Sequence, residues 1–138
     1  ITYAYTKEQL AKDKDGNSIN NQYIPAREHA LNVRMDYDRQ ISSNYGLNIG
    51  LQGRVLSGVE NVEYKDYYDV SKGTISVEYP AYTLWKLSLV QRIGKAVKVN
   101  AALDNLFGYK PKFYYLNSPI TDGVNFQIGV SIDIDKFF

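Results

Sequence analysis

Residues 124–138 read VNFQIGVSIDIDKFF, and this stretch decides the fold. Every second residue from Val124 to Ile134 is apolar, and the residues between them are polar or glycine. Because side chains in a strand point to opposite faces with a period of two, the stretch predicts a strand with one apolar and one polar surface. Strands in soluble proteins usually have about 5–6 residues, whereas crossing a bilayer takes roughly 9–11. We therefore expect the whole of 124–138 to be a strand that crosses a membrane.

Composition leaves both soluble and membrane classes open. The 138 residues carry 16 basic and 15 acidic side chains, so no excess charge argues for nucleic acid as a partner. No cysteine is present, which excludes thiolate catalysis, disulfides and Cys-based zinc or iron–sulfur sites within this chain. No apolar run approaches the roughly 20 residues of a spanning helix. Membrane barrels, however, alternate apolar and polar residues, so their mean hydropathy resembles that of soluble proteins.

Five further segments alternate in the same way and predict five more strands. They are 1–6, 31–38, 47–55, 85–90 and 97–104. The connections between the six strands run long, short, long, short, long. The long ones are 7–22, 58–78 and 108–123, and the short ones are 42–44 and 92–95. Since successive connections of an antiparallel meander fall on opposite ends, all long loops are expected on one side, as in outer-membrane barrels.

No helical repeat of apolar residues is sustained over ten positions. The fold class predicted from residues 1–138 is therefore all-β, an antiparallel up-and-down meander of about six long strands. Within the 58–78 stretch the alternation is lost, so we interpret it as a loop, with short strand extensions as the alternative.

Charged residues lie on the polar faces of these strands. They are Arg34, Asp36, Asp38, Arg54, Lys86, Arg92, Lys98, Asp104 and Asp133. A dry sandwich core would not hold them without large desolvation costs, so they need water or one another. On a soluble one-sided sheet they would form the solvent face, but the apolar faces would then need a second layer that this sequence does not contain. We favour a wall with an apolar outside and a wet inside.

Several short motifs support this interpretation. A strand ends in Asp104-Asn105-Leu106-Phe107 and is followed by Gly108-Tyr109, and the chain closes with Asp135–Phe138. Tyr23–His29 leads into an alternating strand with a Pro-to-His spacing, and Tyr82-Thr83-Leu84 opens another. In these motifs, their order and their spacing, nearly the whole chain resembles the C-terminal end of TonB-dependent outer-membrane receptors.

The resemblance implies a 22-stranded transmembrane barrel whose lumen is closed by an N-terminal plug. Six strands do not close such a barrel, and open edges in hydrocarbon would cost several kcal/mol per unpaired group. We therefore expect 1–138 to be the C-terminal portion of a longer polypeptide whose plug is absent from this sequence. The last strand together with the family then predicts the outer membrane of a Gram-negative bacterium.

The function that the resemblance implies is nutrient uptake rather than bond chemistry. Such a receptor binds a scarce nutrient, for example a siderophore, haem or cobalamin, and transports it into the periplasm with TonB-coupled energy. Its implied partners are the remainder of the barrel and plug, the TonB complex reached through the missing N-terminal part, the lipid bilayer and a small-molecule nutrient. No enzyme activity, cofactor or nucleic-acid partner is expected.

Aromatic residues of the long loops are the candidate ligand contacts. They are Tyr64, Tyr67, Tyr68, Phe113, Tyr114 and Tyr115. Aromatic rings give a large contact area at a small entropy cost, which suits flat or apolar ligands. In the alternative interpretation these rings pack loop on loop or lie at the lipid headgroups. By resemblance, the terminal Phe138 is the signal that the barrel-assembly machinery recognises, and Lys136 nearby can reach the headgroups.

No metal site is predicted, although two candidates exist. His29, the sole histidine, could ligate iron or cobalt in a haem receptor, but the family's Pro-to-His spacing explains it without a metal. Asp66 and Asp69 could bind calcium, yet two carboxylates in a turn more often cap it or face solvent.

Three other classes of protein share parts of this pattern. A passive outer-membrane porin would show the same strands, and a soluble all-β binding module would show the same alternation. An outer-membrane enzyme would need a nucleophile and a base near His29, and no serine lies in a recognisable activating motif.

Overall fold

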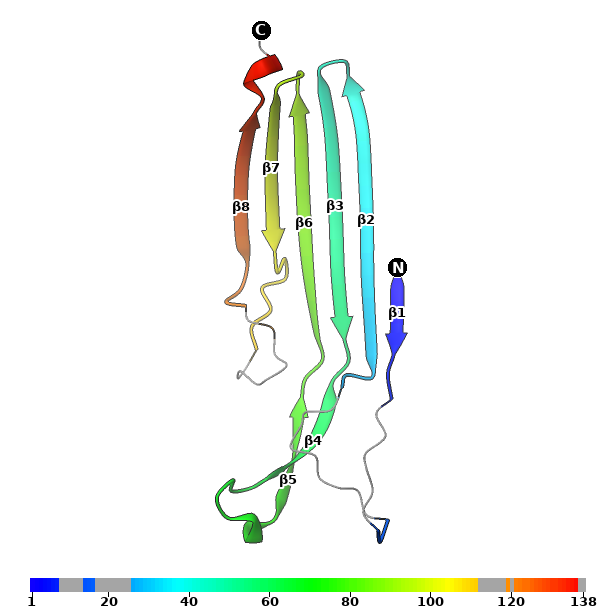
Figure 1. The fold of residues 1–138 in the computed structure, drawn as a ribbon, viewed down its shortest axis with the longest axis vertical. Coiled ribbons are helices and arrows are strands. Elements are labelled where there is room, and N and C mark those ends of the chain that lie inside the picture. The colour runs from blue at the N-terminus through cyan, green and yellow to red at the C-terminus, as the bar shows by residue number, and fades with distance from the viewer. Residues whose placement is uncertain (8–13, 17–25, 112–118, 120, 137–138) are drawn as a thin grey trace.

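The computed structural model describes residues 1–7, 14–16, 26–111, 119 and 121–136. Six antiparallel strands form one sheet in the order β1-β2-β3-β6-β7-β8 (Figure 1). They are β1 (Thr2–Tyr5), β2 (His29–Ser42), β3 (Tyr45–Leu56), β6 (Tyr82–Ile93), β7 (Val97–Asp104) and β8 (Asn125–Ile132). None of the helices in the described part is long and apolar enough to cross a membrane. The all-β antiparallel meander is confirmed.

The connections divide between the two ends of the sheet as predicted. The tight turns β2–β3 and β6–β7 lie at the end where β8 finishes, and the other three connections leave from the opposite end (Figure 1). A hydrogen bond joins the two turns, since the Gly94 amide donates to the Asn44 carbonyl at 2.7 Å. One irregularity interrupts the β2–β3 register, between Gln40 and Ser42 beside the turn.

The last strand is shorter than predicted. We expected a strand over 124–138, but β8 stops at Ile132 and a 3-10 turn follows at Ile134–Lys136. The reason is the partner strand, because Ile132 pairs with Val97, the first residue of β7. Beyond that pair the alternation continues without a ladder, and the Asp133 amide instead donates to the Ala96 carbonyl at 2.8 Å.

The 58–78 stretch is a second hairpin rather than a loop. It contains β4 (Val59–Tyr64) and β5 (Thr74–Tyr79), which form a separate two-stranded sheet and extend beyond the main sheet (Figure 1). Between them, the Lys65 amide donates to the Gly73 carbonyl at 3.0 Å, and a 3-10 turn spans Val70–Lys72. The alternative of short strand extensions within this stretch was the correct one.

The register separates the main sheet into two faces. One face, which we call the apolar face, has Tyr3, Tyr5 and His29 at its long-loop end. Its other residues are Leu31, Val33, Met35, Tyr37, Leu47, Ile49, Leu51, Leu87, Leu89, Val97, Val99, Leu103, Phe126, Ile128, Val130 and Ile132. The opposite face, which we call the polar face, carries Asn32, Arg34, Asp36, Asp38, Asn48, Gln52, Arg54, Lys86, Ser88, Arg92, Lys98, Asn100, Asp104, Asn125, Gln127 and Ser131.

The sheet is a single layer. Leu56, Tyr79 and Ala96 are the only buried apolar side chains in the described part, whereas Phe126, Ile128 and Val130 are 61–68% exposed. Soluble monomers rarely expose a contiguous apolar surface larger than a few hundred Å². Because no described element packs on the apolar face, this face suits hydrocarbon rather than water.

Candidate functional site

Ion pairs organise the polar face. Arg34 pairs with Asp36 on the same strand at 2.7 Å, and Lys86 of β6 pairs with Asp104 of β7 at 3.2 Å. The longest reach is made by Arg92 of β6, whose guanidinium lies 2.8 Å from the Asp38 carboxylate on β2. The Lys86–Asp104 pair therefore joins neighbouring strands, and the Arg92–Asp38 pair joins next-neighbouring strands.

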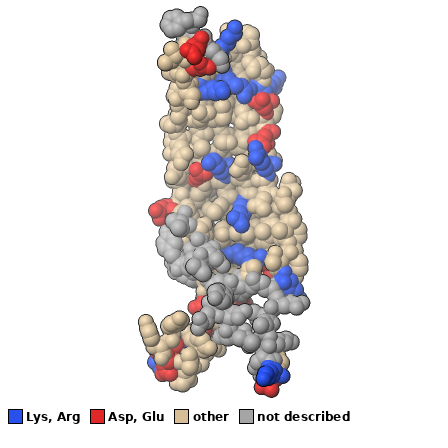
Figure 2. All heavy atoms as spheres, viewed as in Figure 1, with Lys and Arg blue, Asp and Glu red and all other residues tan. Residues whose placement is uncertain are grey.

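Two cations of the polar face are left without such a partner. The face carries five basic residues (Arg34, Arg54, Lys86, Arg92, Lys98) against three acidic ones (Asp36, Asp38, Asp104), an excess of two positive charges. Within the described residues, the side chains of Arg54 and Lys98 take part in no ion pair or hydrogen bond. Figure 2 shows the basic and acidic side chains spread over the sheet. The face is therefore polar, mixed in charge and positive overall.

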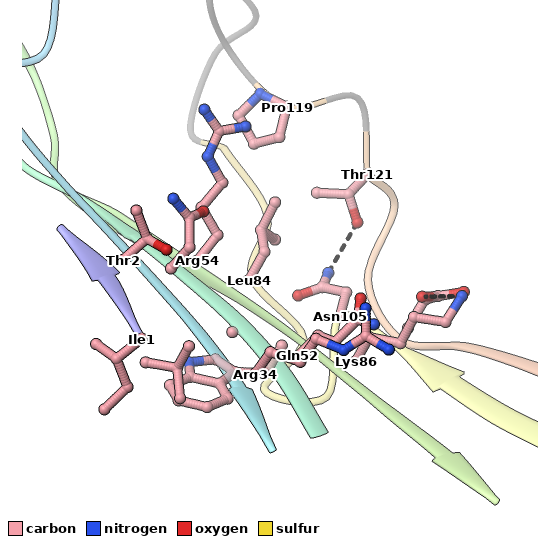
Figure 3. A pocket seen from close by; sticks show the side chains of 15 residues that line it. Ile1, Thr2, Arg34, Gln52, Arg54, Leu84, Lys86, Asn105, Pro119 and Thr121 are labelled. Carbon is pink, nitrogen blue, oxygen red and sulfur yellow. Dashed lines mark hydrogen bonds and ion pairs between the residues drawn. The ribbon is translucent and has the colours of Figure 1, made fainter. Parts of the chain in front are cut away.

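A hollow of about 540 Å³ lies at the long-loop end of this face (Figure 3). Its polar lining comes from β1, β2, β3, β6 and β7 and from the segment after β7. The lining side chains that can donate hydrogen bonds to a ligand include Asn32, Arg34, Gln52, Arg54, Lys86 and Thr121. In Figure 3, Arg54 extends from the sheet toward Pro119 on the far wall.

Asn105 fixes the segment that forms this far wall. Its side-chain nitrogen lies 2.8 Å from the Tyr109 carbonyl, 2.8 Å from Thr121 Oγ1 and 3.0 Å from the Gly123 carbonyl, and its side-chain oxygen accepts from the Tyr109 amide at 2.9 Å. Asn105 is 8% exposed, and its φ of 52° lies in the left-handed region, which Asn tolerates better than most residues. One buried amide thus ties both ends of the third long connection together.

The rest of the Asn-Leu-Phe element lies against the apolar face. The Leu106 amide donates to the Trp85 carbonyl at 2.9 Å, and Phe107, 68% exposed, meets the Trp85 ring edge-on at 6.2 Å. Trp85 covers Gly53 on the neighbouring strand, where a Cβ would lie 2.5 Å from the ring. The motif therefore places an amide inward and an aromatic ring outward at the end of β7.

A stack of three side chains lies where the long connections leave the sheet. The Arg27 guanidinium lies 4.6 Å from the centre of the Tyr82 ring, which stacks on Tyr109 at 5.3 Å. Arg27 also donates to the carbonyls of Pro80, at 2.8 Å, and Ser57. Sequence analysis missed this stack, because its members come from the first long connection, the start of β6 and the third long connection, and only the fold brings them together.

The predicted ligand tyrosines lie on the projecting hairpin. Tyr64 ends β4, whereas Tyr67 and Tyr68 lie at the tip, 74% and 97% exposed, with their rings edge-on at 5.9 Å. None of the three lines the hollow. Phe113, Tyr114, Tyr115 and Phe138 lie outside the described residues.

The carboxylates at the hairpin tip are turn caps. Asp66 pairs with Lys72 at 2.5 Å and accepts from the Tyr68 amide at 3.0 Å, and these hydrogen bonds lower the pKa of Asp66. Asp69 accepts from the Ser71 amide and hydroxyl at 3.2 and 2.6 Å. This confirms the capping interpretation. Over the described part of the chain, no group of three metal-ligating side chains forms.

His29 lies on the apolar face between two tyrosines. Its Nδ1 is 2.6 Å from the Tyr3 hydroxyl, and its ring lies 6.0 Å from Tyr3 and 5.1 Å from Tyr5. Since Leu31, Val33 and Met35 follow on the same face, His29 points away from the polar face. This position does not support a metal ligand facing the hollow and instead makes His29 part of an aromatic border.

Comparison with known families gives one match. A family model described as TonB dependent receptor-like, beta-barrel matches residues 1–106, which span β1 to β7 and end just after Asn105. Neither the curated proteins nor the solved structures contain a match to this chain.

Proposed function

The chain belongs to the TonB-dependent receptor-like β-barrel family, and from this premise we propose that it forms part of the wall of an outer-membrane receptor for a scarce nutrient. The receptor would bind a siderophore, haem, cobalamin or a similar molecule at its outer side. It would then pass the nutrient to the periplasm with energy supplied through TonB. Family membership supports the receptor and transport role, while the nutrient and the energy coupling are our proposal.

The observation that carries this proposal is the two-faced single layer. On β2 the apolar face runs from His29 to Tyr37, eight residues apart. At about 3.4 Å per residue this is about 27 Å along the strand. With a tilt of about 35–45° it corresponds to a height of about 19–22 Å, close to the apolar band of about 25 Å in outer-membrane barrels. The aromatic group of Tyr3, Tyr5 and His29 would then lie at one membrane–water interface.

The strand edges support a larger barrel. β1 and β8 are the two edges of the sheet, and every residue of β8 is exposed. Unpaired backbone groups are costly in hydrocarbon, so further strands of the same polypeptide would pair with both edges. In the proposed receptor a plug lies within the lumen and contacts the TonB complex. The tyrosines at the tip of the β4–β5 hairpin and Phe113, Tyr114 and Tyr115 would contact the nutrient.

Growth on single nutrient sources tests the proposed function. The gene is deleted in its host, and uptake is measured with ferric siderophores, haem and cobalamin offered one at a time. We expect loss of one class of nutrient, restoration by the intact gene, and the same loss when TonB is deleted. Uptake that persists without TonB would indicate a passive pore. Recovery of the native protein in the aqueous fraction without detergent would contradict every membrane function.

A further inference from the structure

We propose that Arg54 is the centre of a lumen-facing site for a small organic anion, whose carboxylate or phosphate oxygens its guanidinium binds. The inference rests on the proposed function, because it names the chemical class of the nutrient that the receptor takes up. It concerns the hollow on the polar face rather than the tyrosines of the hairpin.

The first support is the lack of a counter-ion. Arg34, Lys86 and Arg92 each have a carboxylate within 3.2 Å, whereas none of the described side chains accepts a hydrogen bond from Arg54. A guanidinium has five N–H donors in a planar fork, which matches the two oxygens of a carboxylate or phosphate. Arg54 therefore offers a complete, unused recognition group.

The second support is the chemistry of the surrounding hollow. Asn32 lies directly opposite Arg54 on β2, and Gln52 lies on the same face of β3, so two amide side chains line the same hollow as the guanidinium. Three cations line the hollow, and its one acidic lining residue, Asp104, is already paired with Lys86. This surplus of donors and positive charge favours an anion.

The third support is the size of the hollow and the wall on one side of it. The hollow of about 540 Å³ falls within the roughly 300–1,000 Å³ of small-molecule sites. Its far wall is held by Asn105 through Thr121, and Arg54 extends toward Pro119 on that wall (Figure 3). Lys86 also lines the hollow, so a second oxyanion group of a ligand would find another cation on the same lining.

Lys98 provides a matched control. It is also a cation of the polar face with no ion pair in the described part, but it lies in the row with Gln40, Gly46 and Arg92 near the tight turns and does not line the hollow. Removing either charge changes the net charge of the wall by the same amount. Only the loss of Arg54 should change the binding of an anion.

The test is a titration of the purified full-length receptor in detergent with citrate and, separately, with inorganic phosphate. The variants are Arg54→Gln, Arg54→Lys and Lys98→Gln, each in 50 and 500 mM NaCl. We expect one or both anions to bind. Arg54→Gln should weaken anion affinity at least tenfold, and Arg54→Lys should weaken it less. The affinity of Lys98→Gln should stay within twofold of that of the natural protein. Which anion binds tells whether the site takes carboxylates or phosphates.

Two outcomes would overturn the inference. One is that neither anion binds, or that Arg54→Gln binds as tightly as the natural protein. The other is that Arg54→Gln lowers the thermal midpoint of the receptor without changing anion affinity, because Arg54 would then be neutralised by a carboxylate of the polypeptide that fills the lumen. The proposed function is judged separately by the gene-deletion uptake assay. Uptake that requires the gene but is unchanged in Arg54→Gln would contradict the anion site and leave the proposed function standing.

Discussion

The Arg92 guanidinium reaches across Gly46 to the Asp38 carboxylate, two strands away, with nitrogen and oxygen 2.8 Å apart. Gly46 permits this because a Cβ there would lie 2.8 Å from Arg92 Nε. On the opposite face, Gly53 admits the Trp85 ring in the same manner. Glycines of β3 thus let long side chains lie flat over the middle strand of the wall.

The two glycines should respond differently to alanine. In Gly46→Ala the obstructing atoms belong to flexible side-chain ends, so we expect the loss of one exposed ion pair and a destabilisation below about 1 kcal/mol. In Gly53→Ala a rigid ring is displaced, and overpacking of this kind costs about 1–3 kcal/mol. Thermal unfolding of the receptor in detergent measures both, and a larger effect at Gly46 would contradict this reading of the contacts.

Asn105 should control the third long connection. Asn105→Ala removes a buried amide that bonds the backbone at residues 109 and 123 and the Thr121 side chain, and it strains a positive φ. We expect a destabilisation of about 2–4 kcal/mol and faster proteolysis within 108–123. Asn105→Gly keeps the backbone conformation without the amide, so the difference between the two variants isolates the strain. Unchanged proteolysis in both would show that Asn105 does not fix this segment.

The order of the hairpin tip should depend on pH through Asp66. Hydrogen bonds from Lys72 and from the Tyr68 amide lower the pKa of Asp66 in the folded protein. The stability that ionised Asp66 contributes to the hairpin tip is therefore fully present above its unfolded pKa of about 3.9. This stability is lost as the pH falls through the lowered pKa of the folded protein. Hydrogen-exchange protection of residues 65–73, corrected for intrinsic rates, should decline in that acidic range. Asp66→Asn should remove the dependence on pH.

The tip tyrosines should matter for nutrient capture. If Tyr67 and Tyr68 contact the nutrient, the double change to alanine removes two rings that are 74% and 97% exposed, without disturbing the sheet. Aromatic contacts of this kind contribute about 0.5–1.5 kcal/mol each beyond area burial, so we expect roughly tenfold weaker binding. Tyr37→Ala on the apolar face is the control. Equal nutrient affinity in all three proteins would exclude the tip as a ligand contact.

The carboxyl-terminal residue should matter for assembly rather than for binding. Deletion of Phe138 should lower the amount of heat-modifiable, folded receptor in the outer membrane, whereas Phe138→Tyr keeps an aromatic end and should assemble. Once assembled, both should bind nutrient as the natural protein does. Normal assembly of the deletion variant would show that the terminal ring is not a signal.

Period-two alternation identified the main sheet because one of its faces is apolar and the other polar. The same rule failed where pairing, not polarity, set the boundary, as at Ile132, beyond which β7 offers no partner. It also failed for Val59–Tyr64, because Val59 and Val62 are three residues apart and therefore break the period of two. The Asn105 contacts and the stack of Arg27, Tyr82 and Tyr109 depend on residues far apart in the chain, so local patterns gave no access to them.

Trp85 also equips this chain with an optical probe. It is the single indole among 138 residues, and it lies between Gly53 and Phe107 on the side that would touch acyl chains. Its emission should shift to the blue when the protein enters a vesicle, and brominated acyl chains should quench it. The depth of bromine that quenches best would report how this part of the wall is seated in the bilayer.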